Sequence, residues 1–179
     1  MLKFFWPILF LSLLIIPSSL KQADADQLTH PPQQQTFSAQ PYRLTITAAN
    51  SWQTPSAIAT LYEGNIRRWQ KTLPHQYGPR FAVVSTSGHV LLVDEFINVA
   101  SPYTLTVFAP TGELIAQHSF ADIKQTLNLN AIDLTRQATS GWWVSSPPQL
   151  NTREDHVRIE AGGSTLEVSL LTGAIAPPP

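Results

Sequence analysis

Acidic and imidazole side chains that could share one reaction lie near the middle of the chain. Asp94 and Glu95 are adjacent and follow a long apolar run, and two carboxylates at one site can divide the acid and base roles of a hydrolase. His89 and His118 lie on runs that could be neighbouring strands, so they could join this pair in an active site or a metal centre. The alternative interpretation is structural. The side chains of Asp94 and Glu95 would point to opposite faces of a strand, since successive strand residues alternate. Asp94 would then accept backbone donors in the following turn, and both histidines would be exposed strand residues.

Aromatic side chains offer a different chemistry, the binding of a glycan or a protein. Trp142 and Trp143 are adjacent, so on a strand one would face the core and the other the solvent. An exposed indole has a large apolar face and a polar nitrogen, which suits sugar stacking or protein docking. Arg67 and Trp69 are two residues apart, and strand alternation predicts that they share a face and form a cation–π contact. We therefore predict binding residues at Trp69, Trp142, Trp143 and Arg67; alternatively, the indoles cover the edge of the core.

Composition and motifs exclude several classes of function. Charged residues make up 13% of the 179 residues and the formal net charge is −1, so the chain has no electrostatic footprint for nucleic acid. There is no cysteine, which excludes disulfides and thiolate metal sites. The chain contains no nucleophile elbow, phosphate-binding loop, dinucleotide fingerprint or H-E-x-x-H motif. We predict no cofactor and no metal.

The N-terminus has the pattern of an export signal. One positive charge at Lys3 precedes an apolar run from Phe4 to Ile16, and Ala23 and Ala25 supply the small residues that a signal peptidase recognises. The run is shorter than the roughly 18 apolar residues of a spanning helix. We predict a signal peptide over 1–25 and a periplasmic or secreted protein that meets the membrane only through this signal. The alternative is an uncleaved anchor in the inner membrane.

The rest of the chain divides into a folded body and two loose ends. Residues 26–41 are rich in proline and glutamine, and such a stretch buries too little surface to offset its ordering entropy. We predict a flexible linker there, an all-β domain over 42–175, and a proline-rich tail over 176–179.

Paired β-rich runs around glycine turns dominate the predicted domain. Residues 42–48 alternate apolar and polar types, as expected for a half-buried strand. Four further pairs of runs flank glycine-containing turns, where glycine supplies the positive φ of a tight hairpin. The turn residues Gly64, Gly88 and Gly112 follow one another at intervals of 24 residues, which indicates either a repeated hairpin or the common length of a hairpin with its connector.

One short helix is predicted over 120–127. Phe120, Ile123 and Leu127 form an apolar stripe, and Asp122 lies in the first turn, where its charge favours the helix dipole. Residues 128–140 are ambiguous, because Ile132 and Leu134 could belong to a short strand or a buried loop.

A unit of two hairpins spans Arg80 to Ile123. Its V-S-x-x-G-x-V-x-x-x-D-E and L-x-V-x-x-x-x-G-x-L-I patterns resemble a unit of poorly characterised exported bacterial proteins, and also a blade of a β-propeller. The resemblance covers about a quarter of the chain and implies no activity for particular residues. A chain of this length would contain about three blades of about 48 residues each. A closed propeller needs at least four blades.

These observations predict an all-β fold of antiparallel hairpins, arranged as a two-sheet sandwich or an open, propeller-like stack, with one short helix. The predicted function is a non-catalytic binding or assembly module of the bacterial cell envelope, whose partner is an envelope protein or a glycan. The alternative is a hydrolase or metal-dependent enzyme with a site around Asp94, Glu95, His89 and His118.

Overall fold

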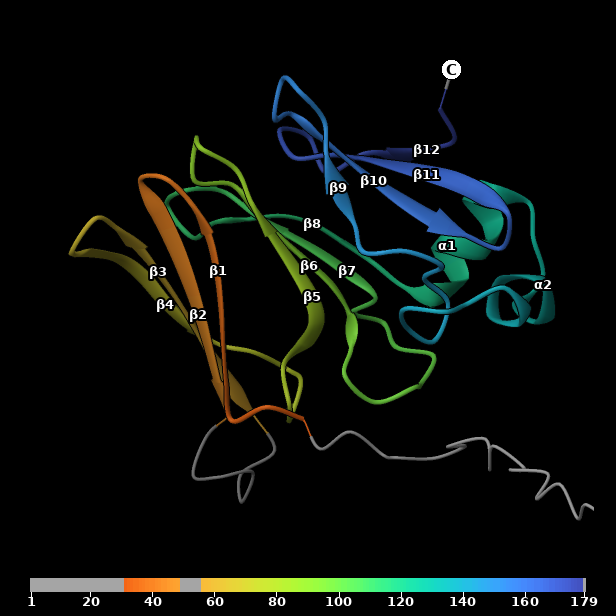
Figure 1. Ribbon diagram of the computed structural model, residues 1–179, viewed down its shortest axis with the longest axis horizontal. Helices are drawn as coiled ribbons and strands as arrows, with labels where there is room; N and C mark the ends of the chain where they lie inside the picture. Colours follow the sequence, from red (N-terminus) through yellow and green to blue (C-terminus); the bar gives the residue numbers. More distant parts are fainter. Residues whose placement is uncertain (1–30, 49–55, 179) are drawn as a thin grey trace, which may run out of the picture. The chain divides into compact units, whose positions relative to one another are not determined.

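Three antiparallel sheets follow one another along the chain in the computed structural model, which describes residues 31–48 and 56–178 (Figure 1). Each sheet is a four-stranded meander, in which strands that follow one another in the sequence are neighbours. The predicted signal peptide lies outside the described residues. The predicted all-β meander of antiparallel hairpins is confirmed, and its strands form three sheets.

The first sheet contains β1 to β4, the central sheet β5 to β8 and the third sheet β9 to β12. The strands of the first sheet are β1 (Gln34–Ala39), β2 (Tyr42–Ala48), β3 (Ala57–Glu63) and β4 (Ile66–Thr72). Those of the central sheet are β5 (Pro79–Val84), β6 (Val90–Glu95), β7 (Leu105–Phe108) and β8 (Leu114–His118). Those of the third are β9 (Gln149–Leu150), β10 (His156–Ala161), β11 (Ser164–Ser169) and β12 (Ile175–Ala176).

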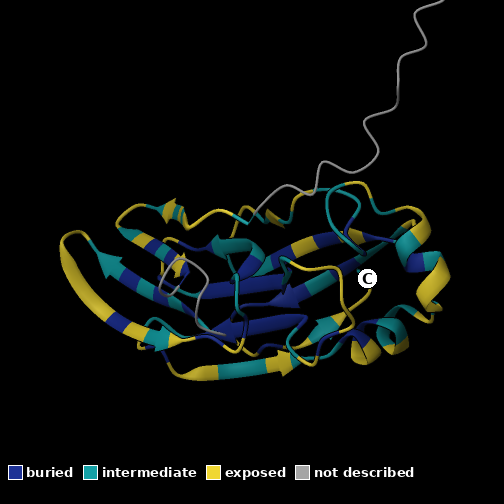
Figure 2. Ribbon diagram, turned by 90° about the horizontal axis from the view of Figure 1, so that it is seen from below, coloured by how far each residue is buried: buried dark blue, intermediate teal, exposed yellow. Residues whose placement is uncertain are grey.

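The two middle strands of the central sheet, β6 and β7, are buried on both faces and belong to the dark strands in the interior of Figure 2. Val90 and Leu92 of β6 belong to the core shared with the first sheet, whereas Leu91 and Val93 belong to the core shared with the third. Strand alternation therefore distributes one apolar run between two cores. This explains why Val90 to Val93 is continuously apolar instead of alternating with polar residues.

Glycines at positive φ form the hairpin turns that the sequence predicts. Gly64, Gly88 and Gly112 lie in the successive turns β3–β4, β5–β6 and β7–β8, with φ values of 57°, 83° and 86°. Gly112 also permits a close approach between sheets, because a Cβ there would stand 2.8 Å from Cγ of Trp69 in the first sheet. The 24-residue interval thus separates three hairpin turns, and one other strand connection lies between each turn and the next.

Helix α1 (Phe120–Leu127) has the predicted boundaries and begins with a capping box. The backbone N–H of Asp122 donates to the Ser119 hydroxyl at 3.2 Å, and the backbone N–H of Ser119 donates to the Asp122 carboxylate at 2.7 Å. These bonds satisfy two N–H groups that the helix itself cannot. The backbone N–H and the hydroxyl of Ser119 both donate to the Asp122 carboxylate, and these two bonds lower the pKa of the Asp122 carboxyl below its usual value.

Replacement of Ser119 by alanine is expected to lower the free energy of unfolding by about 1 kcal/mol, because the first turn of α1 loses its cap. Ser119→Asn should retain most of the stability, since asparagine caps helices as well as serine does. Urea unfolding of the two variants beside the wild type measures the difference. Equal losses in both variants would show that the cap contributes little.

Three sequence-based expectations differ from the structure. Strand β1 lies inside the predicted linker, because it pairs along its whole length with β2 and packs Phe37 against the first core. Ala176, placed in the predicted tail, pairs with Glu167 of β11 as part of β12. The ambiguous stretch contains a second helix, α2 (Ala131–Arg136), which buries Leu134 and is capped by Asn130.

Candidate functional site

A groove lies between the first and central sheets and encloses about 350 Å³. Its walls come from the chain after β4 and from the inner face of the central sheet. Apolar side chains form most of the lining, which consists of Thr72, Leu73, Pro74, His75, Leu92, Tyr103, Thr106, Phe108, Leu114 and Gln117. A volume of this size falls at the lower end of the range for small-molecule sites.

His75 is the most deeply buried polar residue of the groove lining. Its side chain is 2% exposed, and no described residue accepts from or donates to either ring nitrogen. The backbone fixes its position, because the His75 carbonyl accepts from the N–H of Ala57 at 2.7 Å. The ring of Tyr103 meets the imidazole edge-on, with centroids 5.8 Å apart. A buried polar group without a partner is uncommon in folded proteins.

Burial controls the charge of this imidazole. Burial lowers the pKa of His75 below its usual value, while the Glu95 carboxylate and the backbone of Tyr103, which lies near the ring but outside hydrogen-bond geometry, act in the opposite direction. A histidine whose pKa is lowered is mainly neutral at pH 7, and a neutral ring offers one donor and one acceptor. The Ser101 hydroxyl donates to the Glu95 carboxylate and fixes it. On the Phe108 wall, the Lys71 ammonium lies 5.6 Å from the ring centroid.

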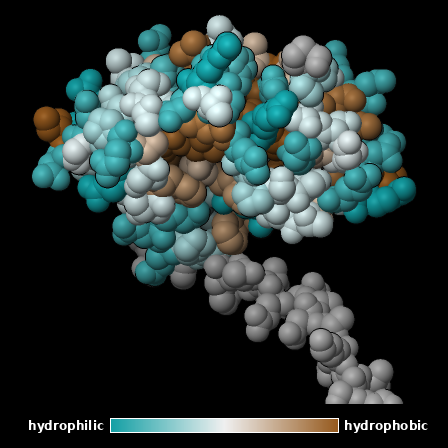
Figure 3. Space-filling model, turned by 45° about the horizontal axis from the view of Figure 1, so that its top comes forward, coloured by the Kyte–Doolittle hydropathy of each residue, from teal (hydrophilic) through white to brown (hydrophobic). Residues whose placement is uncertain are grey.

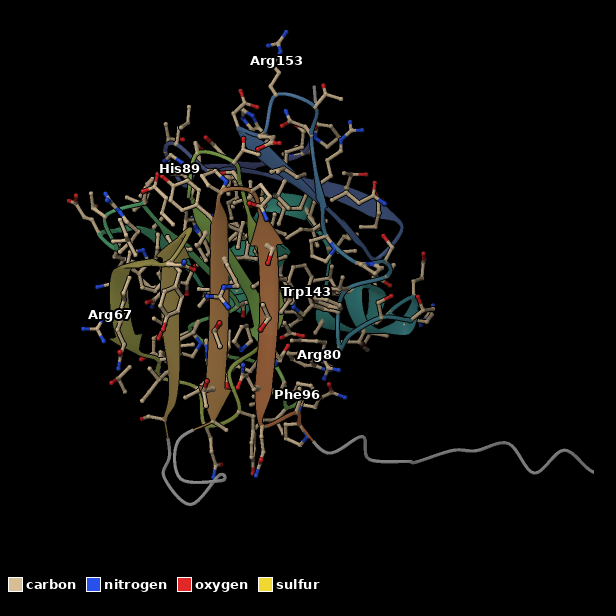
Figure 4. The ribbon with its side chains drawn as sticks, turned by 60° about the vertical axis from the view of Figure 1, so that its left-hand side comes forward. Arg67, Arg80, His89, Phe96, Trp143 and Arg153 are labelled. Carbon is tan, nitrogen blue, oxygen red and sulfur yellow. The ribbon has the colours of Figure 1, made fainter. Side chains whose placement is uncertain are left out.

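A second buried polar cluster joins the central sheet to the segment before β9. Arg80 on β5 places Nε 3.7 Å from Oδ2 of Asp94, which is 1% exposed and has a φ of 60°. The same guanidinium donates to the Phe96 carbonyl at 2.6 Å and to Oδ1 of Asn98 at 2.7 Å. Arg80 and Phe96 lie near each other in Figure 4, and Cζ of Arg80 is 5.1 Å from the centroid of the Phe96 ring. Arg80 thus holds the start of the β6–β7 loop against the end of β6.

Burial also dominates the electrostatics of this cluster. It raises the pKa of Asp94 to about 6, although Arg80, the Glu95 backbone and the indole and backbone N–H groups at 142–143 all favour the charged form. The indole is near the carboxyl but not within hydrogen-bond geometry, since neither Nε1 of Trp143 nor Oδ2 of Asp94 has a partner among the described residues. Gly141 packs closely against this cluster, because a Cβ there would stand 2.9 Å from Cδ of Arg80.

The predicted aromatic binding residues are core or half-buried. Trp143 is 0% exposed and lies in the core between the central and third sheets, and Trp69 is 7% exposed in the other core, 5.7 Å from the ring of Phe108. Trp142 is half-buried and packs on Phe120 with ring centroids 4.6 Å apart. The expected exposed platform of indole faces is therefore wrong for Trp69 and Trp143, which fill space between sheets.

Arg67 does not share a face with Trp69, which corrects the predicted cation–π pair. A bulge shifts the register of β3 and β4, so that Trp69 lies opposite Leu61 but Arg67 lies opposite Tyr62. Arg67 is exposed, donates to the side chain of Gln70 at 3.2 Å, and lies far across the body from Trp143 (Figure 4).

The residues of the alternative catalytic site are separated. His89 precedes β6 and Asp94 lies near its other end, about 15 Å away at the rise of a strand. His118 donates from Nε2 to the Gly173 carbonyl at 2.7 Å. Asp94 faces Arg80 and accepts from the Glu95 N–H at 3.0 Å, whereas Glu95 bonds Ser101. The described part of the chain contains no group of three or more potential metal ligands.

Most of the remaining surface is polar, with apolar atoms recessed near the middle of the face in Figure 3. Within 31–48 and 56–178, no helix has the length and apolar character needed to cross a membrane. Comparisons of the chain with protein-family models, with curated proteins and with solved structures found no significant match. The candidate site therefore rests on its own geometry.

Proposed function

We propose that the protein is an exported, non-catalytic binding module that holds a small, largely apolar molecule in the groove between the first and central sheets. The observation that carries the proposal is the groove itself, which has a volume of about 350 Å³ and a mainly apolar lining. A ligand of matching shape would cover these apolar walls.

The chemistry of the lining favours binding over reaction. Among the described lining residues, His75 is the one side chain whose usual pKa lies near neutrality, and its nearest aromatic neighbour is the phenol of Tyr103. A hydrolytic site would place a nucleophile or an activated water beside such a base, with a third group to orient it. The lining is suited to recognise a ligand mainly by its apolar shape.

The cell envelope is the proposed location because of the charged start, apolar core and small-residue exit of residues 1–25. The indoles that favoured a glycan partner are largely inside the two cores. An apolar groove suits a hydrophobic small molecule better than a sugar, and the proposal adopts that ligand class.

Titration with p-cresol (4-methylphenol), followed by ¹H–¹⁵N NMR, tests the proposal. A fragment of this size should bind with a Kd of about 1–10 mM and shift the amides of Leu73, Leu92 and Thr106 in a saturable way. Leu114→Trp should weaken binding at least fivefold, because Leu114 is exposed at the edge of the groove. The matched control is Leu171→Trp, which changes an equally exposed leucine outside the groove. Linear, non-saturating shifts, or equal affinity in both variants, would refute the groove as a binding site.

A further inference from the structure

Strand β4 is the longest edge strand of the described chain, with seven residues at one side of the first sheet. The other edge strands are short or covered. Strands β9 and β12 have two residues each, and the Gln35 side chain on β1 donates to the Pro79 carbonyl on β5 at 3.3 Å. Ala116 on β8 lies against Gly173, where an added Cβ would stand 2.1 Å from the Ala116 Cβ. Short length and covering protect a sheet edge from further pairing, and β4 has neither among the described residues.

Alternate backbone groups of β4 point away from its neighbour β3. The N–H of Leu73, directly after β4, donates to the Ala57 carbonyl at 2.8 Å. Residues that bond the neighbouring strand alternate with residues that do not in an antiparallel ladder, so Lys71 also faces β3. Gln70 and Thr72 therefore present their N–H and C=O groups to the open side. A shallow depression there is lined by residues of β4 alone, which leaves this edge open to solvent.

Basic side chains make the open edge positive. Arg67, Arg68 and Lys71 all belong to β4, although the formal net charge of the whole chain is −1. Glu63 lies 3.5 Å from Arg68 and offsets one of these charges. Arg67 donates to a neutral side chain of the same strand, and Lys71 lies over the Phe108 ring. Figure 4 shows Arg67 at the outer side of the first sheet. An excess of positive charge at an open edge favours an acidic partner.

These features point to one kind of partner: we propose that an extended, acidic segment of another protein joins the first sheet beside β4 as an additional strand. Backbone hydrogen bonds to the open groups of β4 align such a segment, and the basic side chains select its charge. A second copy of the chain is disfavoured, because two β4 strands side by side would bring their own cations together. This inference goes beyond the proposed function, since the groove binds a small molecule whereas the edge binds a polypeptide.

Two synthetic peptides test the charge selection: acetyl-Glu-Val-Glu-Val-Glu-Val-Glu-amide and its counterpart with lysine in place of glutamate. Each is titrated into the full-length protein at pH 7.5 and followed by ¹H–¹⁵N NMR. We expect the acidic peptide to bind at least tenfold more tightly than the lysine peptide in 50 mM NaCl. Its affinity should fall at least threefold in 500 mM NaCl, because salt screens charges at an exposed edge.

Two measurements on the wild type test the backbone pairing. Amide hydrogen exchange at Gln70 and Thr72 should slow at least fivefold in the complex, because their open N–H groups become donors to the peptide. An acidic peptide whose backbone nitrogens are all methylated keeps its charge but has no N–H to donate. It should bind at least tenfold more weakly than the unmodified acidic peptide. Neither measurement depends on the folding of a variant.

Two variants separate the contributions of backbone and charge. Gln70→Pro removes an open N–H and keeps the bonds between β3 and β4, since proline is tolerated on edge strands, and it should weaken the acidic peptide at least fivefold. Arg67→Gln should weaken it at least threefold. The matched control is Arg153→Gln, which removes the same charge from an exposed residue between β9 and β10, away from Arg67 in Figure 4, and should leave the affinity within 1.5-fold.

Three results would overturn the proposal. Equal affinities for the acidic and lysine peptides would remove the charge selection. Equal affinities for the methylated and unmodified acidic peptides, or unchanged exchange at Gln70 and Thr72, would remove the strand pairing. A concentration-dependent dimer that Gln70→Pro abolishes would assign the open edge to a second copy of the chain instead.

Discussion

Replacement of Trp143 by alanine is expected to lower the free energy of unfolding by about 3–5 kcal/mol. Trp143 is fully buried in the core between the central and third sheets, where it lies with Val144 among the side chains of β6, β7, β10 and β11. Removal of the indole would leave a cavity that sheets on both sides cannot easily close. A loss of this size is a large part of the stability of a domain, and urea unfolding measures it.

Two further variants show whether the loss arises from burial. Trp142→Ala should cost clearly less, because Trp142 is half-buried and packs on Phe120 at the edge of the same core. Trp143→Phe should recover part of the stability, since the phenyl ring fills part of the space. A Trp143→Ala variant within 0.5 kcal/mol of the wild type would contradict the structure and restore Trp143 as a surface residue.

Local signals made the strands and α1 predictable. A glycine turn can be recognised from the glycine and its immediate neighbours alone. Gly64, Gly88 and Gly112 each adopt the positive φ that was expected. The boundaries of α1 follow from Ser119 and Asp122, which lie next to the apolar stripe they introduce. Such features are contained in a few consecutive residues, so one sequence suffices to find them.

The sequence predicted less well which side chains face the core and which face the solvent. The assignment fails where the regular alternation of a strand is interrupted. Trp142 and Trp143 lie between α2 and β9 and outside any strand, so the rule of one residue in and one out does not apply to them. The bulge near Arg67 shifts the register of a hairpin without any glycine or proline to mark it. In both cases the departure depends on how neighbouring sheets pack.

His75 could not be selected among the five histidines from the sequence. Its environment is formed by Tyr103 and Leu92, which approach from another sheet. A proline before it and an apolar residue two positions earlier give no sign that the ring will be buried. The candidate site is a consequence of sheet stacking, which only the three-dimensional structure shows.

The Asp94 carboxyl is expected to make the stability of the protein fall as the pH rises. Its pKa is raised to about 6 in the folded protein by burial, whereas an unfolded aspartate titrates near 3.8 to 3.9. The folded state therefore binds the proton more tightly, and the contribution of this group is most favourable below pH 4. This contribution to the free energy of unfolding decreases by about 3 kcal/mol in total between pH 4 and pH 6, and it is absent above pH 6.

Asp94→Asn removes this titration and keeps an acceptor for Arg80. We expect the variant to gain about 3 kcal/mol of stability relative to the wild type between pH 4 and pH 7.5, measured as the difference between their urea unfolding free energies. Glu113→Gln, which changes an exposed carboxylate in the β7–β8 turn, should show a nearly constant difference. The opposite slope, with the wild type gaining on Asp94→Asn as the pH rises, would mean that the Arg80 guanidinium at 3.7 Å outweighs burial and holds Asp94 ionised. The sign of the slope thus decides whether Asp94, which has a φ of 60° near the end of β6, is present as an ion pair with Arg80 or as a neutral carboxyl group.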